Sequence, residues 1–254
     1  MIALARSELL KLRSTRTALV LFIVVLLVVL VPLVLLMTLL PTTWLETDGV
    51  TNFLNTASTL VPLALLVFGI LGMTGEYRHG TITSSYLVTP RRWQVMVAKL
   101  AVYAIVGMAM MLLAVVLVWA VISLGATIRS VEIDATGGAT LGDYARQIVV
   151  AGLITAFGVA LGALVRAQVI TVAVTLIWAL IAEPFIAVLK PTVGNWLPFS
   201  VFNQVTVANV TTKAADTTAT VGGLDRPQAF LVSIAYIAVV AVAAVFISLR
   251  RDVT

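Results

Sequence analysis

Residues 148–189 read IVVAGLITAFGVALGALVRAQVITVAVTLIWALIAEPFIAVL, an apolar run that holds only two charged residues. A single helix of this length would measure about 63 Å at ~1.5 Å per residue, twice the ~30 Å hydrocarbon core of a bilayer. The polar triplet Arg166-Ala167-Gln168 lies near its middle, where such a segment has to turn back. The stretch therefore predicts two membrane spans joined by a tight turn.

Four further apolar stretches are long enough to cross a membrane, which takes about 20 residues. The six expected spans cover residues 20–40, 53–74, 100–124, 148–165, 169–189 and 229–249. Hydrophobic residues make up 61% of the chain and charged residues 11%, less than half of the roughly 25% usual in soluble domains. The sequence thus predicts an all-α integral membrane protein whose single domain, residues 1–254, has six transmembrane helices.

The first apolar stretch follows basic residues, as the apolar region of a signal peptide does. That region is only ~7–15 residues long and ends at a small-residue cleavage site. Val20–Leu40 has 21 residues without a charge, and no alanine occurs between Ala18 and Ala57. We therefore expect a retained spanning helix.

Lysine and arginine are distributed unevenly between the two sides of this topology. With the N-terminus inside, eleven basic residues lie on the cytoplasmic side and five outside, whereas acidic residues number three inside and seven outside. Cytoplasmic loops carry the excess of basic residues. The chain is expected to be a multi-pass protein of the plasma or inner membrane with both termini in the cytoplasm. The basic residues form short strips beside apolar runs, which does not favour nucleic-acid binding.

Two segments outside the spans also have an apolar pattern. Residues 1–16 place Ile2, Ala5, Leu9 and Leu12 at helical spacing among basic residues, which predicts an amphipathic elbow helix along the inner membrane surface. Residues 196–210 are too short and too polar to span, so we expect a re-entrant or interfacial outer helix before the sixth span. The Thr/Ala-rich residues 211–223 that follow are typical of a surface loop.

The most polar intracellular stretch is the predicted loop Gly75–Val95, which begins GEYRHGTITSSYLVTPRRWQ. Gly80 allows a sharp turn, and Thr81 can cap a short helix that runs to about Val88. Pro90 would end that helix. Such a helix between two spans could act as a lever, but an ordinary positive-inside loop with a turn explains the pattern equally well.

The pattern Glu76-x-Arg78-x-Gly80-Thr81-Ile82, followed by Thr89-Pro90 and Lys99, resembles the signature of type-2 permease subunits of ATP-binding-cassette exporters. The resemblance extends over the elbow helix, the six spans and the outer segment; the polar insert 211–223 departs from it. It implies that the loop forms a coupling helix that contacts a separate ATPase. The residues it implies in coupling are Glu76, Arg78, His79, Gly80, Thr81, Ile82, Thr83, Ser84, Thr89 and Pro90.

The resemblance also implies partners and cargo. We expect two copies of an ATP-binding-cassette ATPase, a second permease subunit that is identical or paralogous, and membrane lipid. ATP and Mg²⁺ would bind the ATPase, with no cofactor on this chain. The implied cargo of export is a drug, a peptide antibiotic or a lipid-like molecule.

Two alternatives use the same topology without transport: a membrane anchor or immunity protein, and an intramembrane hydrolase. The sequence offers little for catalysis, since no lysine follows a glycine as a phosphate-binding loop requires. With one histidine and no cysteine, we expect neither a catalytic residue nor a metal site.

Two features inside the spans are candidates for function or packing. Glu183, followed by Pro184, is ionisable within the fifth span, which makes it a functional candidate by default. Snorkelling toward Lys190, support of an outer gate and contact with substrate remain open. The outer stretch with Trp196, Pro198 and Phe199 resembles the external gate region of the same permeases. Gly158 and Gly162 form a small-residue face that favours helix contact within one protomer over a subunit interface.

Overall fold

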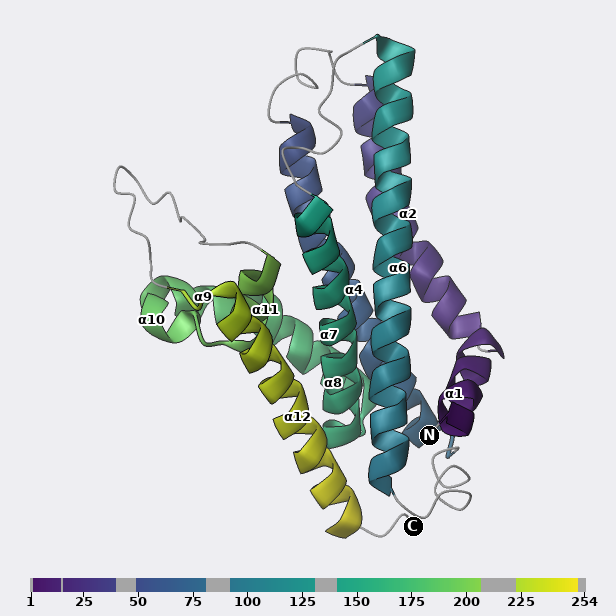
Figure 1. Cartoon of the computed structure of the whole chain (residues 1–254), viewed down its shortest axis with the longest axis vertical. Coiled ribbons are helices and arrows are strands. Elements are labelled where there is room, and N and C mark those ends of the chain that lie inside the picture. Colours follow the sequence, from purple (N-terminus) through teal and green to yellow (C-terminus); the bar gives the residue numbers. More distant parts are fainter. Residues whose placement is uncertain are drawn as a thin grey trace.

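The computed structural model describes residues 2–14, 16–39, 49–80, 92–130, 141–206 and 223–250 (Figure 1). These residues are almost entirely helical, and none of them forms a strand. The helices are α1 (Ile2–Ser14), α2 (Arg16–Leu39), α4 (Gly49–Arg78), α6 (Arg92–Arg129), α7 (Leu141–Val165), α8 (Gln168–Ile177), the π-helical turn η1 (Trp178–Ala182), α9 (Glu183–Leu189), α10 (Pro191–Gly194), α11 (Pro198–Thr206) and α12 (Arg226–Arg250).

The described residues contain six helical segments long and apolar enough to cross a membrane, which confirms the predicted fold class. These segments are Phe22–Leu39, Leu60–Arg78, Trp93–Arg129, Leu141–Val165, Gln168–Leu189 and Arg226–Phe246. The turn within residues 148–189 lies where the sequence predicts it, because α7 ends at Val165 and α8 begins at Gln168. The short helix expected over residues 81–88 and the polar insert 211–223 lie outside the described residues.

The helices extend further than the apolar stretches do. α4 continues to Arg78 and α6 begins at Arg92, so both ends of the predicted loop Gly75–Val95 are helical rather than loop, and that part of the prediction was wrong. α6 has 38 residues, about 57 Å at ~1.5 Å per residue. Hydropathy marks where a chain leaves the hydrocarbon, whereas a helix continues as long as its backbone and polar side chains find partners.

α7 is the central helix of the bundle and packs against α4, α6, α11 and α12 (Figure 1). Its closest neighbour is α4, and glycine makes the approach possible. A Cβ atom on Gly158 would lie 2.3 Å from the Leu66 carbonyl oxygen, and one on Gly162 would lie 2.9 Å from the Ile70 carbonyl oxygen. Both glycines therefore face a helix of the same chain, where a larger side chain would push α4 and α7 apart.

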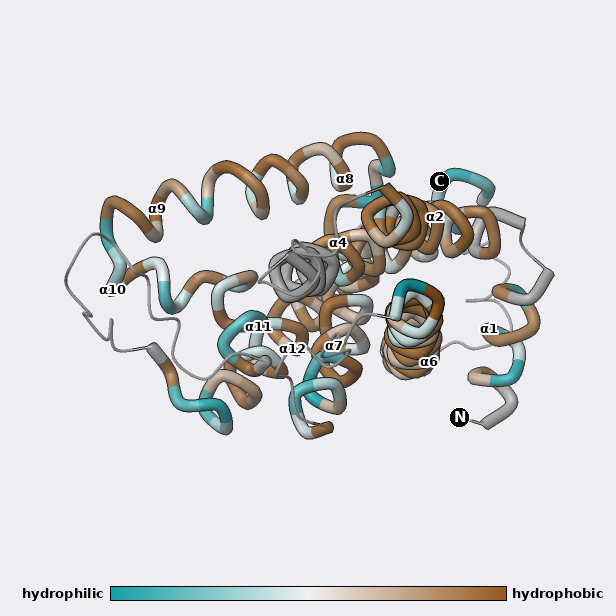
Figure 2. The backbone as a smooth tube through the Cα atoms, turned by 90° about the horizontal axis from the view of Figure 1, so that it is seen from above, coloured by the Kyte–Doolittle hydropathy of each residue, from teal (hydrophilic) through white to brown (hydrophobic). Residues whose placement is uncertain are grey.

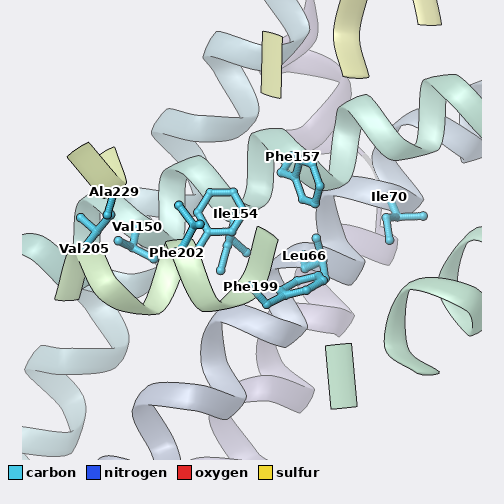
Figure 3. Close-up of a cluster of buried hydrophobic side chains, with 10 residues drawn as sticks. Leu66, Ile70, Val150, Ile154, Phe157, Phe199, Phe202, Val205 and Ala229 are labelled. Atoms are coloured by element: carbon cyan, nitrogen blue, oxygen red, sulfur yellow. The ribbon is translucent and has the colours of Figure 1, made fainter. Parts of the chain in front are cut away.

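An apolar core joins four helices around Phe157 of α7 (Figure 3). The Phe157 ring lies 6.2 Å from the Phe199 ring and 5.5 Å from the Phe202 ring, measured between centroids. Both partners belong to α11, which lies within the segment predicted to be a re-entrant or interfacial outer helix. α11 is thus held by the bundle itself, against α7 and α12. The core residues are Leu66, Ile70, Val150, Ile154, Phe157, Phe199, Val201, Phe202, Val205 and Ala229.

The fifth span runs along the periphery of the molecule. Viewed from above, α8 and α9 follow one side of the bundle as a largely apolar rod (Figure 2). The rod is interrupted by η1, which ends where Glu183 and Pro184 begin α9. Proline has no N–H to donate to the carbonyl of Leu180 four residues earlier, so the regular α-helical pattern cannot continue through this point. A π-turn with its wider hydrogen bonds accommodates the defect.

Candidate functional site

Four charged side chains meet where α1, the last turn of α4 and the first turns of α6 come together, a region that we call the α1 end. The Lys99 ammonium donates to Glu8 Oε2 at 2.5 Å and to Glu76 Oε1 at 2.9 Å. The Lys11 ammonium donates to Glu8 Oε1 at 2.7 Å and to Glu76 Oε1 at 3.0 Å. We refer to Glu8, Lys11, Glu76 and Lys99 as the ionic cluster. It joins three helices, and its most distant members, Glu8 and Lys99, are 91 residues apart in sequence.

The ionic cluster is largely withdrawn from water but electrically balanced. The side chains of Lys99 and Glu8 are only 1% and 5% exposed, that of Glu76 is 11% exposed, and Lys11 remains 40% exposed. Two carboxylates and two ammonium groups give a net charge of zero. A buried charge is tolerated when its partners satisfy it, and removal of one partner is strongly destabilising. The cluster therefore fastens α1 to the base of the segment between α4 and α6.

The charges of the cluster determine how its α1 members titrate. Burial alone would raise the pKa of the Glu8 carboxyl, but the positive charges and hydrogen bonds of Lys99 and Lys11 outweigh it, so its pKa is lowered. Burial alone would lower the pKa of Lys11, but the hydrogen bonds and charges of Glu8 and Glu76 outweigh it, so its pKa is raised. Both shifts favour the charged forms of Glu8 and Lys11, so the ion pair between these two residues persists across the neutral range.

The residues that follow Glu76 end α4 with a tight turn. The His79 N–H donates to the Gly75 carbonyl at 3.0 Å, and the Gly80 N–H donates to the Tyr77 carbonyl at 3.3 Å. Gly80 has a φ of 68°, the left-handed conformation that glycine adopts without strain just beyond a helix. Arg78, His79 and Gly80 are all exposed. They lie on the outside of the α1 end, in contrast to Glu76.

The remaining residues predicted for coupling are Thr81, Ile82, Thr83, Ser84, Thr89 and Pro90. They lie outside the described residues. α4 and α6 place the two ends of this segment at Gly80 and Arg92. The ionic cluster holds both of these helices, so the segment starts and finishes on elements that are joined to each other.

The turn between α7 and α8 also contacts the last turn of α4. The Arg166 guanidinium lies over the Tyr77 ring, 5.3 Å from its centroid. Next to it, Arg78 Nη1 approaches Gln168 Oε1 at 3.4 Å. These contacts link the end of α4 to the fourth and fifth spans as well as to α1 and α6.

Glu183 is buried, with 2% exposure, and its carboxylate points at the first turn of α11. The Ser200 backbone N–H donates to Glu183 Oε1. The first N–H groups of a helix have no partner within that helix and carry partial positive charge, so a carboxylate there stabilises it. In the described part of the chain Glu183 forms no ion pair with Lys190 or another basic residue. Its position fits support of the outer segment better than snorkelling.

The other candidates of the outer segment occupy different environments. Phe199 is buried against Phe157, and Pro198 is the first residue of α11. The Trp196 side chain is exposed, but its carbonyl accepts a 2.5 Å hydrogen bond from the Tyr236 hydroxyl of α12. The structure thus brings Phe199 and Glu183 to α11 and leaves the Trp196 ring outside.

Two features of these regions were not predicted from the sequence, the pairing of Glu8 with Lys11 and the contacts of Gln204. Glu8 counted only as one acid among the cytoplasmic charges, although Glu8 and Lys11 are three residues apart and so share a helix face. Gln204 bridges the Asn195 carbonyl at 2.8 Å and the Leu224 N–H at 2.7 Å, which closes the outer segment. A glutamine within the largely apolar residues 196–210 was the available signal for it.

Among the described residues, no group of three His, Cys, Asp or Glu side chains is placed to hold a metal ion.

Comparison with known proteins assigns a family to most of the chain. Residues 4–183 match the family model described as ABC-2 family transporter protein. This range includes the ionic cluster, the segment between α4 and α6, the turn between α7 and α8, and Glu183. A search of the curated proteins finds no significant match.

Proposed function

The chain belongs to the ABC-2 family of transporter proteins and is a membrane permease component of an ABC transporter; from this premise we propose that it forms one half of an exporter. A second copy or a paralogue would supply the other half, and two separate ATPase subunits would bind ATP and Mg²⁺. The cargo that we propose is a drug, a peptide antibiotic or a lipid-like molecule.

The distribution of charge supports an orientation with the α1 end in the cytoplasm. Eleven of the sixteen basic residues lie on that side of the six-span topology. Reporters fused after positions 45, 135 and 215 should then be outside, and those after 90, 167 and 252 inside. A cytoplasmic reporter at position 215 would contradict the proposed orientation, because it would place the outer segment on the wrong side.

The observation that carries the proposal is the ionic cluster at the base of the segment between α4 and α6. ATP can shift a membrane helix only if some element contacts the ATPase more strongly in one state than in the other. We propose that residues 81–88 make this contact and that exposed Arg78 and His79 adjoin it. Displacement of the segment would then move α4, α6 and α1 together, because Glu76, Lys99 and Glu8 tie them.

The α4–α7 pair offers a route from this end to the outer segment. Gly158 brings α7 against the α4 backbone, and Phe157 of α7 packs on Phe199 and Phe202 of α11. In this proposal α11 is the outer gate, and the Glu183 carboxylate stabilises its closed position. Rigid-body movement of packed helices is a common form of such switching.

The proposal is tested by reconstituting the chain in proteoliposomes with a candidate ATPase encoded beside it. We expect a stable complex whose ATP hydrolysis rises in the presence of cargo and whose cargo moves only with ATP. An ATPase that binds but whose hydrolysis and cargo distribution are unaffected would instead support a transport-inactive anchor.

A further inference from the structure

Arg166 occupies a backbone position that is better suited to glycine. It follows the last residue of α7, has a φ of 62°, and its N–H donates to the Gly162 carbonyl at 2.9 Å. This is the left-handed conformation that commonly ends a helix, and a non-glycine residue is strained there. An arginine at this position suggests that its side chain contributes something that a glycine could not.

The guanidinium of Arg166 is held in place, yet one of its edges is unused. One face lies over the Tyr77 ring. Nε and Nη2 are both buried and have no hydrogen-bond partner. These two nitrogens form a single edge of the planar group, with two parallel donors that match the oxygens of a carboxylate or a phosphate. Two oxygens of one anion would satisfy both donors at once, and because both atoms are covered by the rest of the chain, the anion reaches them only when that cover moves.

In the described part of this chain Arg166 forms no ion pair. At the α1 end the acids among the described residues are Glu8 and Glu76, and both are engaged by Lys11 and Lys99 in the ionic cluster. Arg78, beside Arg166 through its contact with Gln168, adds a second positive charge. The local field therefore favours an external anion.

The surroundings of the turn indicate where the anion comes from. Val165, Val169 and Ile170 flank Arg166 in the chain, and all three side chains are exposed and apolar. They lie at the ends of two spans, where hydrocarbon meets headgroups. Basic sites between spans on the cytoplasmic side are typical of binding to anionic lipid headgroups. We propose that Arg166 binds the phosphate of an anionic phospholipid, whose acyl chains lie against the start of α8.

This inference uses the proposed orientation but not the transport activity, so the two fail independently. The test is the thermal unfolding of the detergent-purified full chain during titration with phosphatidylglycerol. Four variants accompany the wild type: Arg166→Gln, Arg166→Lys, Arg166→Gly and, as a matched control, Arg6→Gln. Arg6 is an exposed cation of α1 at the same end of the molecule. Native mass spectrometry counts the lipids that remain bound.

We expect phosphatidylglycerol to protect the wild type and Arg6→Gln equally. In Arg166→Gln the half-saturating lipid concentration should rise about tenfold or more, as the loss of a charge-assisted two-bond contact implies. Arg166→Lys should fall between them, because an ammonium keeps the charge without the paired donors. Arg166→Gly should unfold at a higher temperature than the wild type without lipid, since its backbone strain is relieved, yet it should respond as weakly to the lipid as Arg166→Gln.

Three results would overturn the proposal. The first is a wild-type lipid response in Arg166→Gln. If that variant also fails to bind its ATPase, the free edge of Arg166 would be assigned to a carboxylate of the ATPase. The second is equal protection by diacylglycerol, which has the same acyl chains without the phosphate. The third is equal protection by inorganic phosphate alone, which would make the site a general anion site.

Discussion

Replacement of Lys99 by methionine tests the ionic cluster directly. Methionine keeps most of the length and apolar contacts of the side chain but removes the ammonium that bonds to Glu8 and Glu76. Because Lys99 is only 1% exposed, water cannot replace those bonds. Two carboxylates would be left with Lys11 alone. Loss of one partner from a buried ion pair costs about 3–5 kcal/mol, and we expect the free energy of unfolding to fall by that amount.

The same cluster provides a matched control and a rescue. Lys11→Met removes an ammonium that is 40% exposed, so its cost should be about 1 kcal/mol or less. Combining Lys99→Met with Glu8→Gln restores a balance of one carboxylate and one ammonium. The double variant should therefore be more stable than the two single costs predict, by about 0.5–3 kcal/mol.

Equilibrium unfolding in mixed micelles titrated with a denaturing detergent gives these energies for the wild type, the three single variants and the double variant. The reasoning would be refuted by equal costs for Lys99→Met and Lys11→Met, or by strict additivity in the double variant. Either result would mean that the cluster is solvated in the membrane and does not tie α1 to α4 and α6.

Three other predictions concern the remaining charged groups. Arg78→Ala should leave the unfolding free energy within about 0.5 kcal/mol of wild type, because the side chain is exposed. Cargo-stimulated ATP hydrolysis by the ATPase should fall. Normal stimulation would exclude Arg78 from coupling. Glu183→Ala should lower the unfolding free energy by about 0.5–2 kcal/mol, because the hydrogen bond to the Ser200 N–H is lost. Glu183→Gln keeps an acceptor oxygen and should cost less. Equal costs for the two variants in unfolding assays would contradict the capping role of Glu183. The folded-state pKa of Glu8 lies below its ordinary value of 4.5, so the stability that the ionised carboxylate contributes is present above pH 4.5 and is lost as the pH falls through the lowered pKa. Glu8→Gln should remove this loss from the pH profile of the unfolding free energy. An unchanged loss at acid pH would assign it to other groups.

The spans could be predicted from the sequence because hydrocarbon imposes a length and a polarity on every crossing segment. The 42 residues of 148–189 are too long for one helix that crosses the membrane a single time, and the chain turns at Arg166 as expected. The ends of helices have no such constraint. α4 continues through Glu76, whose Oε1 accepts hydrogen bonds from Lys11 and Lys99, contacts that no local pattern indicates.

The partners in the candidate site were harder to predict than its residues. Glu76 and Arg78 are two positions apart and have the same apparent role in the sequence, yet one is buried in the ionic cluster and the other is exposed. Glu183 was recognised as unusual, but its contact with Ser200 depends on how α11 folds back into the bundle. Such contacts arise from tertiary packing and leave no periodicity in one sequence.

The π-turn η1 determines the direction in which Glu183 points. A π-turn holds one residue more than an α-helical turn, so everything beyond it is rotated by about 100° relative to an uninterrupted helix. Removal of a single residue from Trp178–Ala182 would therefore re-register α9 without shortening the span appreciably, and the carboxylate would turn away from α11 toward a different neighbour. The orientation of α9 toward α11 thus depends on the one additional residue in η1. Deleting a residue of η1 would change the neighbours of Glu183 more than any substitution of Glu183 itself.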